Sequence, residues 1–338
     1  MDHDVEARYR IGFFLVPEFS MIAFVSAVEV LRLVNRVTGS AEYGWTILST
    51  DYGPVRASNG MDLNADSKLA DAGPLDAVFI CGGLNVQDFD DRETLAGLRR
   101  RSSHGAALGA LCTGTYVLAN AGLMNGYRCT IHWENIPAFV EAFPDLEVTS
   151  GLFAIDRNRY TCAGGTSALD LMLNMISIQH GPNIAAAVSD ELIHHRIRDS
   201  SEGQRMDLRL RAGVAHPKLL AVVACMEENI ENPFSCAQLA SSVGLSTRQL
   251  ERLFHTYMGA PPTRYYMRMR LERSRFLLKQ TALPIFDVAL ASGFISASHF
   301  SKCYREYFGA PPSGERRRKI DPSTLINYDQ NTDSPKVN

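Results

Sequence analysis

The sequence FHTYMGAPP at 254–262 returns as YREYFGAPP at 304–312, and this repetition decides the fold of the C-terminal third of the chain. A second pair, LASSVGL at 239–245 and VALASGF at 288–294, precedes it in the same order. The glycines of the second pair are 49 residues apart and the proline pairs are 50 apart. Repetition at this spacing indicates one supersecondary unit used twice.

Each copy has the pattern of a helix-turn-helix: a short apolar-periodic helix, a glycine in the turn, and a second helix. Ser246 and Ser296 are suitable N-caps for the two second helices. Their inward faces are predicted to carry Leu250, Leu253 and Phe254 in the first copy and Phe300, Cys303 and Tyr304 in the second. A single basic helix is usually only a solvated surface, but two copies in register favour a reading surface for DNA.

The outward faces of these helices carry the side chains that we expect to reach base edges in a major groove. They are Arg248, Glu251 and Arg252 in the first copy and Ala297, Ser298, Ser301 and Lys302 in the second. Arg248 and Arg252 are the stronger candidates, because arginine pairs with guanine through two hydrogen bonds.

The run GFISASHFSKCYREYFGAPP at 293–312 resembles the signature of the AraC/XylS family of bacterial transcription regulators. The resemblance extends over roughly 217–318. It implies a DNA-binding domain in which two helix-turn-helix units, joined by a long helix, each read one major-groove segment. We expect the joining helix over 264–279, with apolar rows that include Tyr266, Leu271, Ser274, Leu277 and Leu278.

The composition is that of an ordinary globular protein with room for two or three domains: 338 residues, 46% hydrophobic and 21% charged. We expect a cytoplasmic protein, because the sequence has neither an apolar run long enough to span a membrane nor a signal peptide. The seven cysteines are scattered and form no C-x-x-C pair. This favours a reducing compartment and disfavours a metal site, and nothing in the sequence predicts a cofactor.

The formal net charge of −3 conceals two halves of opposite sign. Residues 214–319 hold 15 Lys+Arg and 8 Asp+Glu, which gives +7, and the rest of the chain holds 19 and 29, which gives −10. A basic module beside an acidic remainder is typical of a DNA-binding domain attached to a domain of another kind.

Short apolar runs alternate with helical patterns in the N-terminal half and predict a parallel α/β sheet covered on both faces. We expect strands at 10–16, 45–49, 77–81, 106–111 and 159–162 and helices at 21–37 and 167–179. The polar segment after residue 197 lacks periodicity. The expected organisation is therefore a first domain over 1–197, a linker over 198–214, an all-α DNA-binding domain over 215–320 and a disordered tail over 321–338.

The turn LCTGT at 111–115 follows a strand and opens a helix, so Cys112 is expected in a strained position at the sheet edge. Helix amides at such a turn would lower the pKa of the thiol. Cys112 and His132 could then form a nucleophile and its base. The competing interpretation is that Cys112 is an inert small hydrophobe.

Four segments in the first half resemble the DJ-1/PfpI superfamily: 81–83, 110–114, 130–132 and 164–167. The resemblance implies a flavodoxin-like α/β sandwich with a cysteine on its elbow. Active members also use a glutamate on the first helix, and the matching position here is Ala23, while Glu18 and Glu29 fall outside that register. The resemblance therefore implies a degenerate site and no enzyme.

Together the two halves resemble the GlxA-like branch of AraC-type regulators, which includes regulators of glycine betaine, carnitine and arginine catabolism. The resemblance implies an activator that is a homodimer, binds double-stranded operator DNA and a small-molecule effector, and contacts RNA polymerase. The expected effector site comprises Gly82, Gly83, Cys112, Thr113, His132 and Trp133.

An aromatic cage suits a quaternary ammonium effector. Trp133 is its best candidate and Phe19 a further one, whereas Phe14 more plausibly belongs to the core. Two alternatives remain open at this stage. One is a DJ-1/PfpI-type hydrolase or glyoxalase that uses Cys112 and His132 and carries a DNA-binding tail. The other is redox sensing through oxidation of Cys112.

Overall fold

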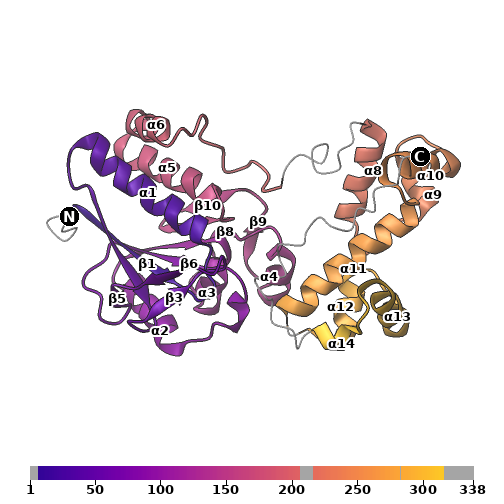
Figure 1. The fold of residues 1–338 in the computed structure, drawn as a ribbon, viewed down its shortest axis with the longest axis horizontal. Helices are drawn as coiled ribbons and strands as arrows, with labels where there is room; N and C mark the ends of the chain where they lie inside the picture. Colours follow the sequence, from indigo (N-terminus) through magenta and orange to yellow (C-terminus); the bar gives the residue numbers. More distant parts are fainter. Residues whose placement is uncertain (1–6, 206–215, 282, 316–338) are drawn as a thin grey trace. The chain divides into compact units, whose positions relative to one another are not determined.

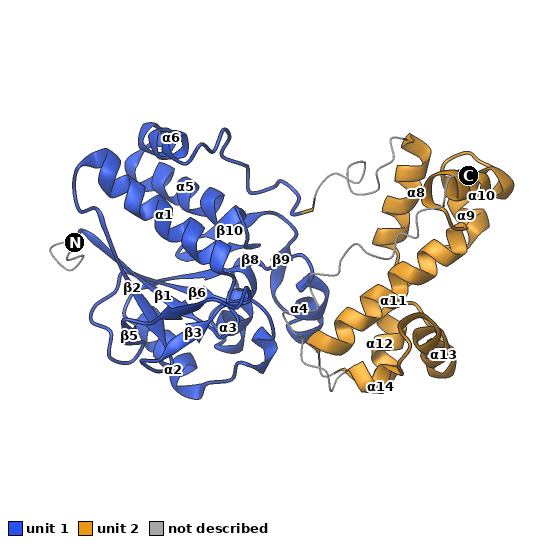
Figure 2. Ribbon diagram, viewed as in Figure 1, with its two compact units in different colours: residues 1–204, 320–338 blue, residues 205–319 orange. Residues whose placement is uncertain are grey.

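A computed structural model describes residues 7–205, 216–281 and 283–315. These residues form two compact units that divide between Gln204 and Arg205, called unit 1 and unit 2 (Figure 2). Within the described ranges, no helix is both long and apolar enough to cross a membrane.

Unit 1 is built on a seven-stranded sheet in the order β10-β11-β7-β6-β1-β2-β5. Its strands are β1 (Tyr9–Leu15), β2 (Tyr43–Ser49), β5 (Ser67–Lys68), β6 (Ala77–Cys81), β7 (Ala107–Leu111), β10 (Phe153–Asp156) and β11 (Arg159–Cys162). All neighbours are parallel except β10 and β11, which are antiparallel. Two small sheets accompany it, formed by β3 (Pro54–Arg56) with β4 (Asp62–Asn64) and by β8 (Arg128–Thr130) with β9 (Glu147–Thr149).

Helices cover both faces of this sheet (Figure 1). One face packs against α1 (Met21–Thr38), α5 (Ser167–His180) and α6 (Pro182–Glu191). The other packs against α2 (Arg92–Ser103), α3 (Thr115–Asn120) and α4 (Ile136–Ala142), with short 3-10 turns η1 (Val86–Asp88) and η2 (Cys112–Gly114) at the strand ends. Phe13 belongs to the first core and Phe14 to the second, and both are fully buried. This alternation on an apolar strand confirms the predicted doubly covered α/β sheet.

The described part of unit 2 is helical, as predicted. Its helices are α8 (Pro217–Glu228), α9 (Cys236–Ser242), α10 (Thr247–Met258), α11 (Pro262–Gln280), α12 (Ile285–Ala291), α13 (Ala297–Phe308) and α14 (Pro312–Glu315). The first helix-turn-helix is α9–α10 and the second is α12–α13, and α11 joins them (Figure 1). The joining helix is slightly longer than predicted, and every apolar-row position named for it is buried.

The same local chemistry forms both turns. Gly244 and Gly293 each adopt a left-handed backbone, with φ of 62° and 75°, which a residue with a Cβ adopts only at a cost. The hydroxyl oxygens of Ser246 and Ser296 accept hydrogen bonds from the backbone N–H of the residue three positions later, at 3.3 and 3.4 Å. Both predicted N-caps are therefore confirmed.

The inward faces agree with the prediction at two positions in each copy. Leu250, Phe254, Phe300 and Tyr304 are fully buried. Leu253 and Cys303 are only half-buried, because they lie at the edge of the apolar stripe.

The predicted linker starts too early. Residues 198–204 belong to unit 1 and pack against it. Arg198 forms an ion pair with the fully buried Asp170 at 2.6 Å, and the backbone N–H of Leu152 donates to the Glu202 carbonyl at 3.0 Å. A polar sequence without periodicity looks like a linker when its partners lie far away in the sequence. The rest of the expected linker, 206–214, and the expected disordered tail, 321–338, lie outside the described residues.

Candidate functional site

The first candidate site is the outward face of α10. Leu250 and Phe254 anchor the helix in the core, so that Arg248, Glu251 and Arg252 are exposed on the other side. Neither arginine has an ion-pair partner among the described residues, which leaves both guanidinium groups available to a phosphate or a base edge.

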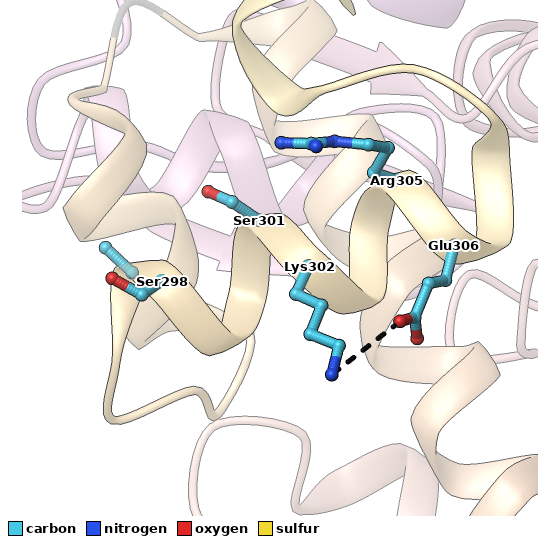
Figure 3. A pocket seen from close by; sticks show the side chains of 6 residues that line it. Ser298, Ser301, Lys302, Arg305 and Glu306 are labelled. Atoms are coloured by element: carbon cyan, nitrogen blue, oxygen red, sulfur yellow. Dashed lines mark ion pairs between the residues drawn. The ribbon is translucent and has the colours of Figure 1, made fainter.

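The corresponding face of α13 carries short side chains near the helix start and charged side chains farther along. Ala297, Ser298, Ser301, Lys302, Arg305 and Glu306 line an open hollow of about 510 Å³ (Figure 3). In Figure 3, Ser301 and Arg305 project from one edge of the helix, and Lys302 and Glu306 from another. The Lys302 Nζ lies 4.0 Å from a Glu306 carboxylate oxygen, and both side chains are mostly exposed, so this ion pair contributes little stability.

The elbow of unit 1 has the predicted strain. Cys112 lies between β7 and α3 with a left-handed φ of 60°. Gly164 permits this conformation because a Cβ there would come within 2.9 Å of the Cys112 sulfur. The glycine thus lets two chain segments approach closely over the thiol.

The predicted lowering of the thiol pKa is wrong. Burial raises the pKa of Cys112 to about 12, and this outweighs the hydrogen bond from the Thr113 backbone, which lowers it. Burial also lowers the pKa of His132 to about 4, so the imidazole is neutral at physiological pH. A thiol with so high a pKa lacks the thiolate that a nucleophile needs.

Ala23, which the sequence comparison predicts at the position of the first-helix acid, is buried and has no hydrogen-bonding side chain. Both nearby glutamates have other partners: Glu18 accepts a hydrogen bond from Asn85, and Glu29 pairs with Arg32 at 2.6 Å.

A small cavity of about 220 Å³ lies at the edge of unit 1 beside the elbow. Its lining residues come from the β8–α4 loop, the residue before β10, the start of α5 with the segment that precedes it, and residues 198–204. They are His132, Trp133, Leu152, Ala163, Gly164, Gly165, Thr166, Ser167, Arg198 and Gln204. The rings of His132 and Trp133 lie side by side, with centroids 5.7 Å apart.

Comparison with known proteins connects both units to characterised families. The helix-turn-helix domain family matches residues 239–318, and the DJ-1/PfpI family matches residues 9–178. The chain is 46% identical over 307 residues to the HTH-type transcriptional regulator GbdR of Pseudomonas aeruginosa, which covers 91% of this chain and 84% of that regulator. It is 37% identical over 310 residues to the regulator GlxA of Rhizobium meliloti, with 91% and 96% covered.

The chain belongs to the GlxA-like branch of the AraC-type transcription regulators. A crystal structure of an AraC family transcriptional regulator from Pseudomonas putida also superposes with a TM-score of 0.51 at 32% identity, covering 54% of this chain and 99% of that one. The chain is therefore a DNA-binding regulator whose first unit has the DJ-1/PfpI fold.

The structure brings together only part of the expected effector site of this regulator. His132 and Trp133 line the cavity, whereas Gly82, Gly83, Cys112 and Thr113 do not. The Thr113 hydroxyl instead donates to the Gly83 carbonyl at 2.7 Å, and a Cβ on Gly82 would collide with Thr113. Thr113 and the two glycines thus pack against one another where β6 and β7 end.

The two remaining aromatic candidates, Phe14 and Phe19, are fully buried in the cores and do not line the cavity. The sequence did not predict Arg198 and Gln204 as cavity residues, because both fall in the expected linker. One signal was available: Asp170 stands inside the apolar helix SALDLMLNM at 167–175, and a carboxylate in such a helix requires a buried cationic partner.

Proposed function

We propose that this regulator is ligand-responsive and acts as a cytoplasmic activator of genes for the catabolism of a small nitrogenous metabolite, such as glycine betaine, carnitine or arginine. In this proposal unit 1 binds the effector and forms a homodimer, and unit 2 binds the operator and contacts RNA polymerase. The effector changes DNA occupancy or activation only because its affinity differs between two states of the chain.

The observation that carries the proposal is the cavity lined by Trp133 and a neutral His132 in a chain that also carries two helix-turn-helix units. An aromatic ring face attracts an alkylammonium group by about 0.5–2 kcal/mol. Because the imidazole is uncharged, it does not repel such a cation. The cavity volume of about 220 Å³ suits a metabolite and excludes a peptide.

On the DNA side, we assign major-groove contacts to Arg248, Glu251 and Arg252 on α10 and to Ala297, Ser298, Ser301 and Lys302 on α13. Exposure of α10 at all three positions and the open hollow on α13 support this assignment. The first helix is suited to guanine, since its arginines can form bidentate hydrogen bonds, and the second to smaller contacts such as those with thymine methyl groups.

The enzymatic alternative, a hydrolase or glyoxalase that uses Cys112 and His132, has less support. A thiol with a pKa of about 12 and a histidine with a pKa of about 4 do not form a thiolate–imidazolium pair at neutral pH. The raised thiol pKa also disfavours redox sensing, which needs an accessible thiolate.

The effector part of the proposal is tested by thermal shift of the full chain with glycine betaine, dimethylglycine, carnitine, choline and arginine. A compound that binds the native state raises the unfolding midpoint of unit 1 once its concentration exceeds Kd. We expect one of these compounds to do so and the Trp133→Ala variant to lose the shift. A shift that survives unchanged in Trp133→Ala would contradict the assigned pocket.

A further inference from the structure

Part of the wall of the proposed effector cavity is formed by the end of unit 1. Two of its lining side chains, Arg198 and Gln204, come from the last residues of unit 1 before unit 2 begins at Arg205. We call residues 198–204 the strap. Any molecule in the cavity therefore lies against the segment that leads into the DNA-binding half of the chain.

The strap is held on unit 1 by polar contacts. The Arg198 backbone N–H donates to Asp170 Oδ1 at 2.7 Å, and its guanidinium donates to Oδ2 through Nε and Nη2 at 2.9 and 2.6 Å. Gly203 forms an isolated β-bridge with Gly151. The Gln204 side-chain amide donates to Ile131 O at 3.0 Å and to Gly151 O at 2.9 Å.

Two polar atoms of the strap have no hydrogen-bond partner among the described residues. Arg198 Nη1 has no hydrogen-bond partner among the described residues, although the side chain is 27% exposed and lines the cavity. Gln204 Oε1 is buried and has no hydrogen-bond partner in the part of the chain that the structure describes, whereas the amide nitrogen of the same side chain donates to three acceptors. An unpaired buried acceptor costs about 1–3 kcal/mol, which offsets part of the stabilisation from the other contacts of the strap.

The residues that line the cavity are of two kinds. The first is polar: the Arg198 guanidinium donates to the Thr166 hydroxyl at 2.8 Å, where the 14-residue helix α5 begins with no side-chain cap. A cation and a helix N-terminus both favour an anion. The second kind is aromatic: the rings of Trp133 and His132 also line the cavity and favour an alkylammonium group.

We propose that Arg198 binds the carboxylate of a zwitterionic effector through Nη1, while the ammonium group of the effector lies on Trp133. This assignment rests on the proposed function for the class of effector. The carboxylate then contacts the strap only when the strap is docked, so effector binding favours the docked strap and docking raises effector affinity by the same factor.

The test compares glycine betaine with choline, which share a trimethylammonium group and differ in the carboxylate. Isothermal titration of the full chain should show glycine betaine bound more tightly by about 10- to 100-fold, the contribution expected of a hydrogen bond between charged groups. The double variant Asp170→Asn/Arg198→Gln removes the guanidinium without leaving a buried carboxylate unpaired, and we expect it to reduce the preference to within about threefold. Arg36→Gln, which removes an exposed arginine on α1 paired with Glu191, is the matched control and should keep the preference.

A second measurement does not depend on the folding of any variant. Amide hydrogen exchange of the parent chain should slow in residues 198–204 and at Leu152 when glycine betaine is added, and not when choline is added at the same occupancy. Equal binding of the two compounds by the parent chain, or a preference that persists in the double variant, would overturn the role of Arg198 while leaving the effector class intact. Failure of glycine betaine, dimethylglycine, carnitine and arginine alike to bind would overturn the effector class itself, and the Arg198 assignment with it.

Discussion

Substituting the turn glycine of each helix-turn-helix by alanine should have unequal effects, although the two positions are equivalent in the repeat. Gly244 and Gly293 both have a left-handed φ, which costs a residue with a Cβ about 1–2 kcal/mol. At Gly244 the added methyl group meets nothing nearer than Lys218 Nζ at 4.0 Å. We therefore expect Gly244→Ala to lower the stability of unit 2 by about 1 kcal/mol.

At Gly293 the same methyl group has no room. It would overlap the Ile230 carbonyl oxygen and lie 3.0 Å from Pro233 Cδ and 3.2 Å from Arg270 Nε. Arg270 cannot easily move away, because its Nε donates to the Ser292 carbonyl at 3.0 Å and its guanidinium lies over the Phe294 ring. Overpacking adds about 1–3 kcal/mol to the backbone cost, so the total for Gly293→Ala is about 3 kcal/mol.

The assay uses the placement of the tryptophans. Trp45 and Trp133 are the only two in the sequence and both belong to unit 1, so tryptophan fluorescence follows unit 1, while helical circular dichroism includes unit 2. A loss of 1 kcal/mol lowers the Tm of a domain of this size by roughly 4–8 °C. We expect the unit 2 transition to fall at least twice as far in Gly293→Ala as in Gly244→Ala, with the fluorescence transition unchanged in both. Equal shifts in the two variants would refute the steric argument.

Three further predictions concern single side chains. Arg252→Ala should relax discrimination at one operator base pair by about 1–3 kcal/mol, measured by fluorescence anisotropy on a set of single-base operator variants; a variant that ranks them as the parent does excludes the contact. Burial raises the pKa of Cys112 to about 12, so iodoacetamide should leave Cys112 largely unlabelled in native protein at pH 7, as quantified by peptide mass spectrometry, and stoichiometric labelling would reopen the enzymatic alternative. Although burial favours the neutral acid, Arg275 and Lys279 hold the pKa of Glu315 below its usual value. The stabilisation of unit 2 by the Glu315 carboxylate is thus present above the unfolded-state pKa and is lost as the pH falls through the folded-state pKa. In the Glu315→Gln variant, the Tm of unit 2 should therefore fall less steeply as the pH is lowered. A pH profile of the Tm equal to that of the parent would contradict this.

The sequence predicts best those features that local patterns determine. The strand at Ala77–Cys81 and the helix starting at Ser167 were predicted at their observed boundaries, because apolar runs and turn residues mark them directly. The short strands β3, β4 and β5 were not predicted. Each has two or three residues and is defined by pairing partners elsewhere in the chain.

The cavity of unit 1 is a second example of features that local patterns do not determine. His132 and Trp133 were predicted because they follow a family motif. The position of Arg198 depends on Asp170, which lies 28 residues earlier, and no local pattern connects the two residues. The pKa of Cys112 was predicted in the wrong direction because the helix start is visible in the sequence, whereas burial by the distant Gly164 segment is not.

The two helix-turn-helix units of this chain have nearly the same interior and different exteriors. Leu250 and Phe254 on α10 correspond to Phe300 and Tyr304 on α13, yet the outward face of α10 carries Arg248 and Arg252 near its start, whereas that of α13 starts with the short side chains of Ala297 and Ser298. With the base contacts proposed above, a reversed DNA segment would present each of these helices with the bases suited to the other. In that proposal, one chain distinguishes the two directions along a double helix, and a target without internal symmetry fixes the direction in which the chain lies on it.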